Sequence, residues 1–375
     1  MTAGNGPTGP DSLVADSEWL AADSEWLVAD SVWWGGRLRH AEAVRLRGGV
    51  PVDAIPAAQM PSDAVCRRLP GTLLPGLCDA HVHSALVDLG TVRAGGIAAV
   101  WDLGGVPAAV AALADRAAQP GSGLPRIRHA GPFLTAPGGY PSDRAWAPPG
   151  SWREIRSAAD AAEAVGEAHA AGATIIKVTV HAGGPMLDPA TLTALVDAAG
   201  ALHLPVVAHA EGPGTVAAAY EAGARLLAHT PWTEALDAGL ARDCAARMTW
   251  ISTLDIHGWG TPDAAQDTAI GNLRAFLSHG GAVRYGTDLG NGPLPPAINP
   301  REIRALQRAG LSPDDVLTAM TAAPARPRTG THAPTGAEPA AEPCWIPGGL
   351  SLEPDGFADV LATARVVGPD VRPRG

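Results

Sequence analysis

Short apolar runs alternate with alanine-rich amphipathic stretches along most of this chain. The runs have the length and composition of buried strands, and the stretches between them have the period of helices. Strands are expected over residues 77–83, 97–103, 125–131, 173–180, 204–209, 224–229, 247–253 and 282–288. Helices are expected over residues 107–118, 156–171, 189–200, 214–222, 234–245, 264–279 and 311–325. Strands that alternate with helices in this way favour an α/β fold, a parallel (β/α)8 TIM-like barrel rather than an open sheet.

The two ends of the chain predict a second, smaller domain. Residues 31–72 and 348–366 contain short alternating runs broken by glycine and proline, with a turn expected at residues 354–356. We therefore expect residues 31–72 and 340–375 to form one composite β-sandwich beside a barrel over residues 73–328.

Residues 1–30 carry a seven-residue repeat in which Asp-Ser is followed by tryptophan. A heptad spacing could give a short helix with a Trp/Leu stripe, and a loosely packed extension is the alternative. An ordered stripe would need a docking surface, which allows a homo-oligomer.

Composition excludes several classes of protein. The chain has 375 residues, 46% of them hydrophobic, and a formal net charge of −11, which argues against nucleic acid or an anionic membrane as a partner. No apolar run is long enough for a transmembrane helix, and the N-terminus lacks the pattern of a secretory signal. The four cysteines show no pair spacing, so we expect a cytoplasmic protein with reduced thiols.

The first expected barrel strand carries a His-x-His pair. His81 and His83 occupy alternate positions, so both imidazoles project from the same side of the strand and could bind one metal ion. Later strand runs end in or near further residues that can bind metal, namely Lys177, His209, His229 and Asp288. The carboxyl ends of the strands are where barrel enzymes build their active sites.

Lys177 is the only lysine of the chain, whose other cationic side chains are all arginine. It lies inside an apolar strand run. An amine can lose its proton when it is desolvated and can then react or be modified, whereas a guanidinium group stays charged. Lys177 is therefore predicted to have a chemical role, with chance survival or an ion pair as the alternative.

Other residues near the expected strand ends are candidates for substrate contacts. They are Tyr140 in a Gly-Gly-Tyr-Pro loop, His181, His257 and Trp232. Ordinary packing or a solvated loop position is an equally open interpretation for each. Asp102 is expected to orient its neighbours rather than to react.

The motifs, taken in order, resemble the amidohydrolase superfamily, in the subgroup around imidazolonepropionase-like proteins and Xaa-Pro dipeptidases. They are PGLCDAHVH (75–83), GIAAVWDLG (96–104), HAGPFLTAPGGYP (129–141), IIKV (175–178), VVAHAEG (206–212), LLAHT (226–230), GTDLG (286–290), SPDDVLTAMTAAPA (312–325) and DGFADV (355–360). The resemblance covers roughly residues 70–325, with weaker matches in the flanking β segments.

This resemblance implies a binuclear metal centre, with zinc as the expected ion. His81, His83 and Asp288 would hold one ion, and His209 and His229 the other. Lys177, carboxylated by carbon dioxide, would bridge both as a carbamate. A hydroxide shared by the two ions would attack the substrate, Asp288 would shuttle the proton, and the ion at His229 would polarise the scissile carbonyl.

The resulting function hypothesis is a hydrolase of an amide or cyclic amide C–N bond in a small molecule. A Xaa-Pro-type dipeptidase is the nearest alternative, although no arginine is an evident partner for a substrate carboxylate. Arg284 could lie deep in the barrel. A biosynthetic cyclase or a deaminase on the same barrel, and a metal-binding scaffold without catalysis, are further alternatives. The bridging lysine argues against an imidazolonepropionase.

Overall fold

The computed structural model describes residues 24–321 and 341–368. Its parallel strands are β6 (Cys78–Val82), β7 (Ala99–Asp102), β8 (Arg126–His129), β9 (Phe133–Thr135), β10 (Trp152–Glu154), β11 (Ile176–His181), β12 (Val206–Glu211), β13 (Leu226–Leu227), β14 (Thr249–Ile251) and β15 (Ala282–Arg284). They form a seven-stranded sheet in the order β10-β9-β11-β12-β13-β14-β15 and a three-stranded sheet in the order β6-β7-β8. Each strand expected between residues 77 and 288 overlaps an observed one.

Backbone hydrogen bonds connect the smaller sheet to the larger one on both sides. The amide of Ala80 on β6 donates to the carbonyl of Tyr285 after β15 at 3.0 Å. At the other edge, the amide of Thr174 before β11 donates to the carbonyl of His129 on β8 at 3.1 Å. The arrangement is consistent with the barrel that the sequence predicts, and it places β6 between β7 and the end of β15.

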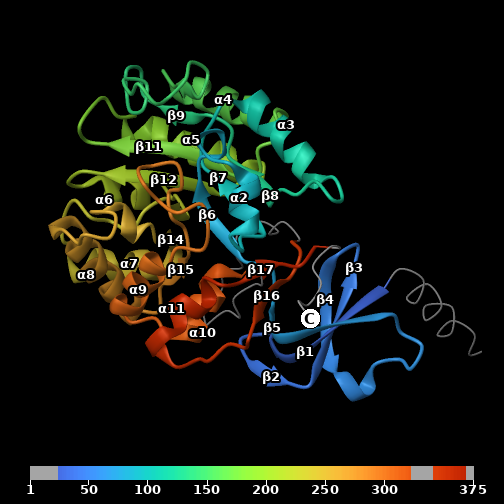
Figure 1. The fold of residues 1–375 in the computed structure, drawn as a ribbon. Helices are drawn as coiled ribbons and strands as arrows, with labels where there is room; N and C mark the ends of the chain where they lie inside the picture. Colours follow the sequence, from blue (N-terminus) through green and yellow to red (C-terminus); the bar gives the residue numbers. More distant parts are fainter. Residues whose placement is uncertain (1–23, 322–340, 369–375) are drawn as a thin grey trace, which may run out of the picture.

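Helices surround these strands (Figure 1). They are α2 (Leu89–Ala94), α3 (Pro107–Ala118), α4 (Ala158–Ala170), α5 (Pro189–Ala201), α6 (Thr215–Glu221), α7 (Ala238–Arg247), α8 (Ala264–Ser278), α9 (Pro300–Ala309) and α10 (Pro313–Met320). Short 3-10 turns are η1 (Ala57–Gln59), η2 (Ser84–Leu86) and η3 (Leu254–Ile256). α10 begins after a capping box in which Ser312 and Asp315 satisfy each other's backbone amides.

Helices α2 and α9 are absent from the sequence expectations. α9 follows a proline-rich segment, and this composition predicts that the loop continues through the first residues of the helix. The Asn299 side chain caps it by accepting from the Arg301 amide at 3.0 Å. Ile303 and Leu306 then bury one face of the helix.

The chain ends build a separate β-rich domain, as predicted. Its strands are β1 (Ser24–Trp33), β2 (Leu38–His40), β3 (Glu42–Arg47), β4 (Val50–Pro56), β5 (Cys66–Leu74), β16 (Cys344–Pro347) and β17 (Arg365–Val366). The order is β17-β16-β5-β1-β3-β4, with β2 paired to β1. The described strands belong to one hydrogen-bonded sheet, where the sequence led us to expect a sandwich. A small core of its own includes Leu27, Val32, Val44 and Leu69.

Two expectations for the chain ends are wrong in detail. Residues 24–30, assigned to the extension, belong to β1, which pairs with β3 on one side and β5 on the other. Cross-strand pairing and burial of Leu27 and Val32 override the heptad spacing there; residues 1–23 lie outside the described part. In the C-terminal stretch, the turn at residues 354–356 leads into helix α11 (Pro354–Leu361), whose Phe357 and Leu361 are buried, rather than into a strand.

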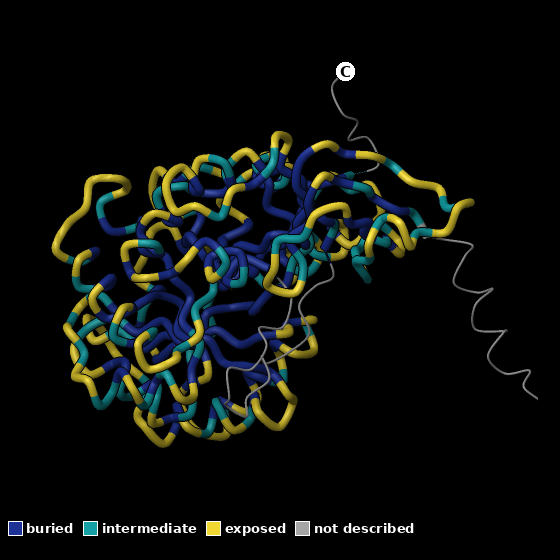
Figure 2. Tube along the Cα trace, turned by 90° about the horizontal axis from the view of Figure 1, so that it is seen from below, coloured by how far each residue is buried: buried dark blue, intermediate teal, exposed yellow. Residues whose placement is uncertain are grey.

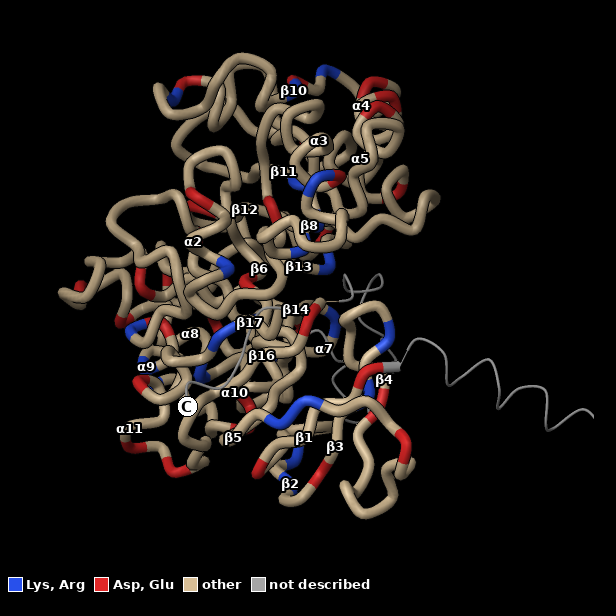
Figure 3. Tube along the Cα trace, turned by 45° about the vertical axis from the view of Figure 1, so that its right-hand side comes forward, with Lys and Arg blue, Asp and Glu red and all other residues tan. Residues whose placement is uncertain are grey.

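Buried residues lie inside the molecule, and most charged residues lie on its outer elements. Buried segments run through the interior of the parallel sheets, and exposed segments form the outer loops (Figure 2). Acidic and basic residues are interspersed over the outer elements (Figure 3), and the acidic residues of α4 include Asp160 and Glu167, which pair with Arg153 at 2.7 and 3.0 Å. The four cysteines are free thiols. Among the described residues no helix is long and apolar enough to cross a membrane.

A substitution of Trp33 tests whether β1 belongs to the folded core. Its indole is 1% exposed, and its Nε1 donates to Asp314 Oδ1 at 2.7 Å, which ties β1 to α10. We expect Trp33→Ala to lower the free energy of unfolding in urea by about 3–5 kcal/mol, through lost burial and a lost hydrogen bond.

The matched control for this prediction is Trp34→Ala, since Trp34 is only partly buried. Trp34→Ala should lower the free energy of unfolding by clearly less than Trp33→Ala does. A loss below about 1 kcal/mol for Trp33→Ala would contradict the placement of β1 in the folded core.

Candidate metal centre

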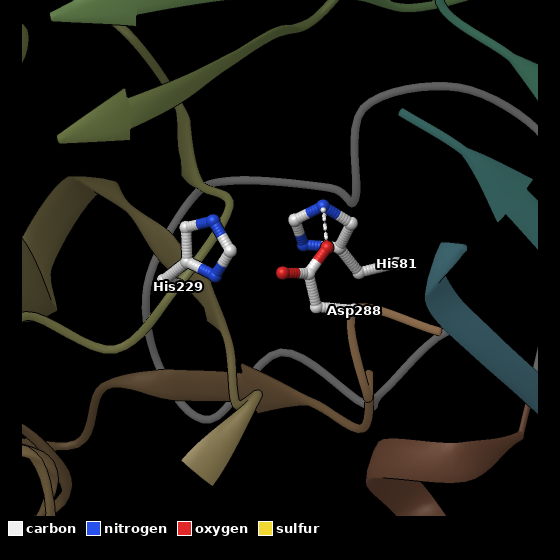
Figure 4. Close-up of side chains that lie close together, drawn as sticks. All are labelled: His81, His229 and Asp288. Carbon is white, nitrogen blue, oxygen red and sulfur yellow. Dashed lines mark ion pairs between the residues drawn. The ribbon is translucent and has the colours of Figure 1, made fainter. Parts of the chain in front are cut away.

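Three of the predicted metal ligands meet at the carboxyl ends of the strands (Figure 4). His81 lies on β6, His229 follows β13 and Asp288 follows β15. One nitrogen or oxygen from each of the three lies within 4.8 Å of the others. Asp288 Oδ1 is 3.0 Å from His81 Nε2 and 3.1 Å from His83 Nε2. The His-x-His pair therefore directs both imidazoles at one carboxylate oxygen.

Backbone carbonyls fix which ring nitrogens face Asp288. His81 Nδ1 is 2.8 Å from the carbonyl oxygen of Ala228, and His83 Nδ1 is 3.2 Å from that of Gly104. A carbonyl can only accept, so each Nδ1 donates its proton. In a neutral ring the Nε2 atom then carries a lone pair, which is the form that binds a metal.

The charge states of these groups favour a cation between them. Burial lowers the pKa of His81 well below its ordinary value, although Asp288 opposes the shift. Burial would raise the pKa of Asp288, but its interactions with His81, His83 and His229 hold it well below its ordinary value. The Nε2 lone pair of a neutral His81 would then face an ionised carboxylate oxygen. A cation bound by both groups would remove that repulsion.

The pKa of His83 shifts in the opposite direction to that of His81. Burial lowers its pKa, but the hydrogen bond and the charge of Asp288 outweigh burial, and the net shift is upward. Without a cation, a protonated His83 can donate a hydrogen bond to Asp288, but the lone pair of His81 Nε2 then still has no donor. Both histidines and the carboxylate would be satisfied together by a metal ion.

A second set of contacts holds the ligand-bearing segments in place. Asp79 Oδ1 accepts from the amides of His81 and Thr287, both at 3.0 Å, and Asp79 Oδ2 accepts from Thr287 Oγ1 at 2.6 Å. These bonds fasten β6 to the segment that carries Asp288. Asp288 itself has a left-handed backbone with φ of 58°, and its Oδ2 accepts from Asn291 Nδ2 at 2.8 Å.

Asp102 has the orienting contacts that the sequence suggested. Its carboxylate accepts from the amides of Ser84 at 2.9 Å and Gly104 at 3.0 Å. Ser84 follows the end of β6, and Gly104, which follows β7, supplies its carbonyl to His83.

Lys177 is placed on β11 with 1% of its surface exposed. Burial lowers the pKa of its amine to about 7, although the charges of Asp288 and Asp102 oppose the shift. Its Nζ lies 5.9 Å from the centroid of the Phe133 ring. A substantial share of the amine is therefore uncharged at neutral pH, which is the reactive form.

His209 and His229 lie next to one another on adjacent strands. Their ring centroids are 5.1 Å apart, and the His81 and His229 centroids are 4.6 Å apart. His229 Nδ1 is 2.9 Å from Thr253 Oγ1. The ligand atoms of His229 lie within 4.8 Å of those of His81 and Asp288, and those of His209 within 4.8 Å of those of His181 and Glu211. The assignment of His209 and His229 to one ion stays a prediction.

Glu211 is a residue that the sequence interpretation missed. Its Oε2 is 3.0 Å from His209 Nε2 and 3.1 Å from His181 Nδ1. The sequence spacing could have indicated this residue, since Glu211 lies two positions after His209 on the same strand and so projects from the same face.

Aromatic side chains surround the histidines. The Tyr140 ring stacks on His209 with centroids 4.8 Å apart and also contacts His181 at 5.0 Å. Trp232 lies between His229 and His257, with centroid distances of 5.4 and 5.2 Å. The four residues expected to contact substrate are thus all close to the cluster.

Trp146 and His257 have features that distinguish them from the other aromatic residues at this end. Trp146, another residue that the sequence interpretation missed, lies 6.1 Å from both His83 and Tyr140 and is 42% exposed. His257 is buried, and among the described residues its Nε2 has no hydrogen-bond partner. A buried nitrogen without a partner is a position where a substrate group could bind.

The raised pKa of Asp79 gives a pH-dependent prediction. Burial raises the pKa of Asp79 to about 7, so the folded chain holds this proton more tightly than the unfolded one. Its contribution to stability is therefore greatest at acidic pH and declines as the pH rises from about 4 to about 7.

Asp79→Asn removes that titration. In urea unfolding of metal-free protein, the advantage of wild type over Asp79→Asn should be larger at pH 5 than at pH 7.5. An advantage that is equal at the two pH values would contradict the account of Asp79.

Comparisons with known proteins identify the fold. No family model matches the sequence, and no curated protein matches it. Solved structures do match. An Aspergillus niger (A. niger) ochratoxinase has 17% identity and a TM-score of 0.69, over 90% of this chain and 91% of that one. A Xaa-Pro dipeptidase with bound methionine has 17% identity and a TM-score of 0.69, over 92% and 98%. An amidohydrolase has 18% identity and a TM-score of 0.70, over 92% and 96%. The resemblance to amidohydrolases that the motifs predicted is thereby confirmed at the level of the fold.

Proposed function

We propose that this protein is a metal-dependent hydrolase that cleaves an amide or cyclic amide C–N bond in a small molecule. The observation that carries the proposal is the buried cluster at the strand ends, in which the Nε2 atoms of His81 and His83 face one carboxylate oxygen of Asp288. A closed (β/α)8 barrel, supported by the backbone bonds at both edges of the smaller sheet, is part of the same proposal. The similar folds of an ochratoxinase and a Xaa-Pro dipeptidase also support it.

The residues present fit a pair of divalent ions, and their nitrogen and oxygen donors suit zinc. The proposed ligands are His81, His83, Lys177, His209, His229 and Asp288. Lys177 would contribute as a carbamate formed with carbon dioxide, a reaction that requires the neutral amine which burial supplies. The carbamate would add the negative charge that a set of mostly neutral imidazoles lacks. When bound, the ions would supply a water nucleophile that is active at neutral pH and would polarise the substrate carbonyl.

Asp288 is the proposed proton carrier. As an ionised, buried carboxylate it can accept the proton of the nucleophile and donate it to the leaving nitrogen. Asn291 Nδ2 fixes the orientation of this carboxylate by donating to Oδ2. The backbone of Asp288 in the left-handed region adds to that constraint.

The surrounding residues are proposed to hold the substrate. Tyr140, whose ring lies over His209, could offer its phenol to the substrate, and His257 could offer Nε2, which has no hydrogen-bond partner within the described ranges. His181 lies beside them at the same strand ends, and Trp232 offers an apolar wall next to His229. Apolar walls with few polar groups are typical of small-molecule sites.

A Xaa-Pro-type dipeptidase is the second candidate. A peptide carboxylate would need a cation, and Arg284 is unsuited because its guanidinium lies 5.0 Å from the Trp101 ring. Arg144 is a better candidate, since it lies 5.5 Å from the centroid of the Tyr140 ring at the edge of the site. An amide panel that includes Xaa-Pro dipeptides would separate the two activities.

The variant Asp288→Asn tests the proposed reaction. Asparagine keeps the shape and one oxygen but cannot take up the proton, so kcat should fall by about 10²–10⁴-fold on the best substrate of an amide and lactam panel. Metal content, measured by elemental mass spectrometry on the same sample, should stay close to the wild-type value.

The matched control is Asp143→Asn, an exposed carboxylate on the loop that carries Tyr140. It should retain wild-type kcat. Full activity in Asp288→Asn with the metal in place would contradict the proton-carrier role, and the absence of any activity in the wild type across the panel would favour a non-catalytic scaffold.

A further inference from the structure

The pair formed by Glu211 and His181 lies against one of the proposed metal ligands but is outside the predicted ligand set. Glu211 and His181 are direct register partners on the parallel strands β12 and β11. The amide of Ala182 also donates to the carbonyl of Glu211 at 2.8 Å. The sheet itself therefore places both side chains beside His209.

The carboxylate dictates the proton position on the His209 ring. An ionised carboxylate only accepts hydrogen bonds, and Oε2 is hydrogen-bonded to His209 Nε2 at 3.0 Å. His209 Nε2 must then carry a proton, and in a neutral ring Nδ1 is the nitrogen that retains the lone pair. His181 Nδ1 lies 3.1 Å from the same Oε2.

The neighbours of this pair restrict its movement. The Tyr140 ring stacks on His209 and lies against His181, and Thr179 Oγ1 donates to the Tyr140 carbonyl at 2.8 Å. A Cβ atom on Gly183 would lie 2.5 Å from His181 Nε2, so a larger residue there would displace this ring from its present position. The Tyr140 ring thus lies against both imidazoles that approach Glu211.

We propose that Glu211, supported by His181, is a positioning residue that holds His209 in the tautomer with Nε2 protonated and so assigns Nδ1 to the metal. The inference rests on the proposed function, since it requires that His209 bind metal. A carboxylate that accepts the distal N–H of a ligating imidazole fixes the ring orientation and makes the ligand nitrogen more basic. His81 and His83 use backbone carbonyls for the same purpose and present the opposite nitrogen, Nε2.

Glu211 has a second conceivable role, which the test must separate. Its side chain is 33% exposed, so it could instead contact a positively charged group of the substrate. A substrate contact would change KM and leave metal binding intact, whereas a positioning role changes metal binding with little effect on KM.

The experiment uses Glu211→Ala, Glu211→Gln and a control, Glu234→Ala. Glu234 lies at the same end of the fold, and its carboxylate accepts from the Gly214 amide at 2.8 Å. Zinc affinity is measured on metal-free protein by competition with a chromophoric chelator, the cobalt-substituted forms are compared by visible absorption, and kcat and KM are measured on one amide. The tautomer of His209 in the metal-free protein is read from ¹⁵N chemical shifts.

We expect Glu211→Ala to weaken the affinity for one of two zinc ions by about 10–100-fold, alter the cobalt spectrum and leave KM within about twofold. Glu211→Gln, which keeps an acceptor oxygen, should be intermediate, and Glu234→Ala should match the wild type. The ¹⁵N shifts should show a protonated Nε2 on His209 in the wild type and a mixture of tautomers in Glu211→Ala.

Two outcomes would overturn the inference alone, because the wild type would still bind two zinc ions. One is wild-type zinc affinity and tautomer in Glu211→Ala. The other is a rise in KM with unchanged metal binding, which would make Glu211 a substrate contact. A wild-type chain that binds no zinc would instead remove the proposed function, and this inference with it.

Discussion

The removal of six ionisable side chains from water at one end of the parallel strands is the constraint on which the rest of the structure depends. The exposed fractions of His81, His83, Lys177, His209, His229 and Asp288 range from 1% to 9%. Such burial is unfavourable unless each polar atom has a partner. Backbone carbonyls and the Thr253 hydroxyl satisfy one nitrogen on each of three imidazoles. The proposed cations between the remaining lone pairs and the Asp288 carboxylate would satisfy these groups together.

The scaffold contributes orientation rather than additional ligands. Asp79 fastens β6 to the segment of Asp288, Asp102 fixes the loop that supplies a carbonyl to His83, and Glu211 fixes His209. Each is a carboxylate that accepts from donors on or beside a proposed ligand. Since a metal site depends on ligand angles as much as on ligand identity, these contacts account for much of the polar structure at the strand ends.

Much of the fold and several residues of the candidate site could be predicted from the sequence. Alternating strand and helix patterns are local, and the chemistry of His81, His83 and Lys177 follows from their residue types, so both were evident without a structure. The role of residues 24–30 was not, because the pairing of β1 with β5 joins segments about forty residues apart in the sequence. Glu211 and Trp146 were missed because their positions at the site depend on which strand ends lie side by side.

The most direct test of the central claim is the zinc content per chain of protein purified without chelator, measured by elemental mass spectrometry on the wild type and on Lys177→Arg. The account predicts about two zinc ions per wild-type chain and a clear loss in Lys177→Arg, because a guanidinium group cannot form the carbamate. About one ion, or none after zinc is added back, would contradict the binuclear centre. Wild-type zinc content in Lys177→Arg would contradict the bridging lysine.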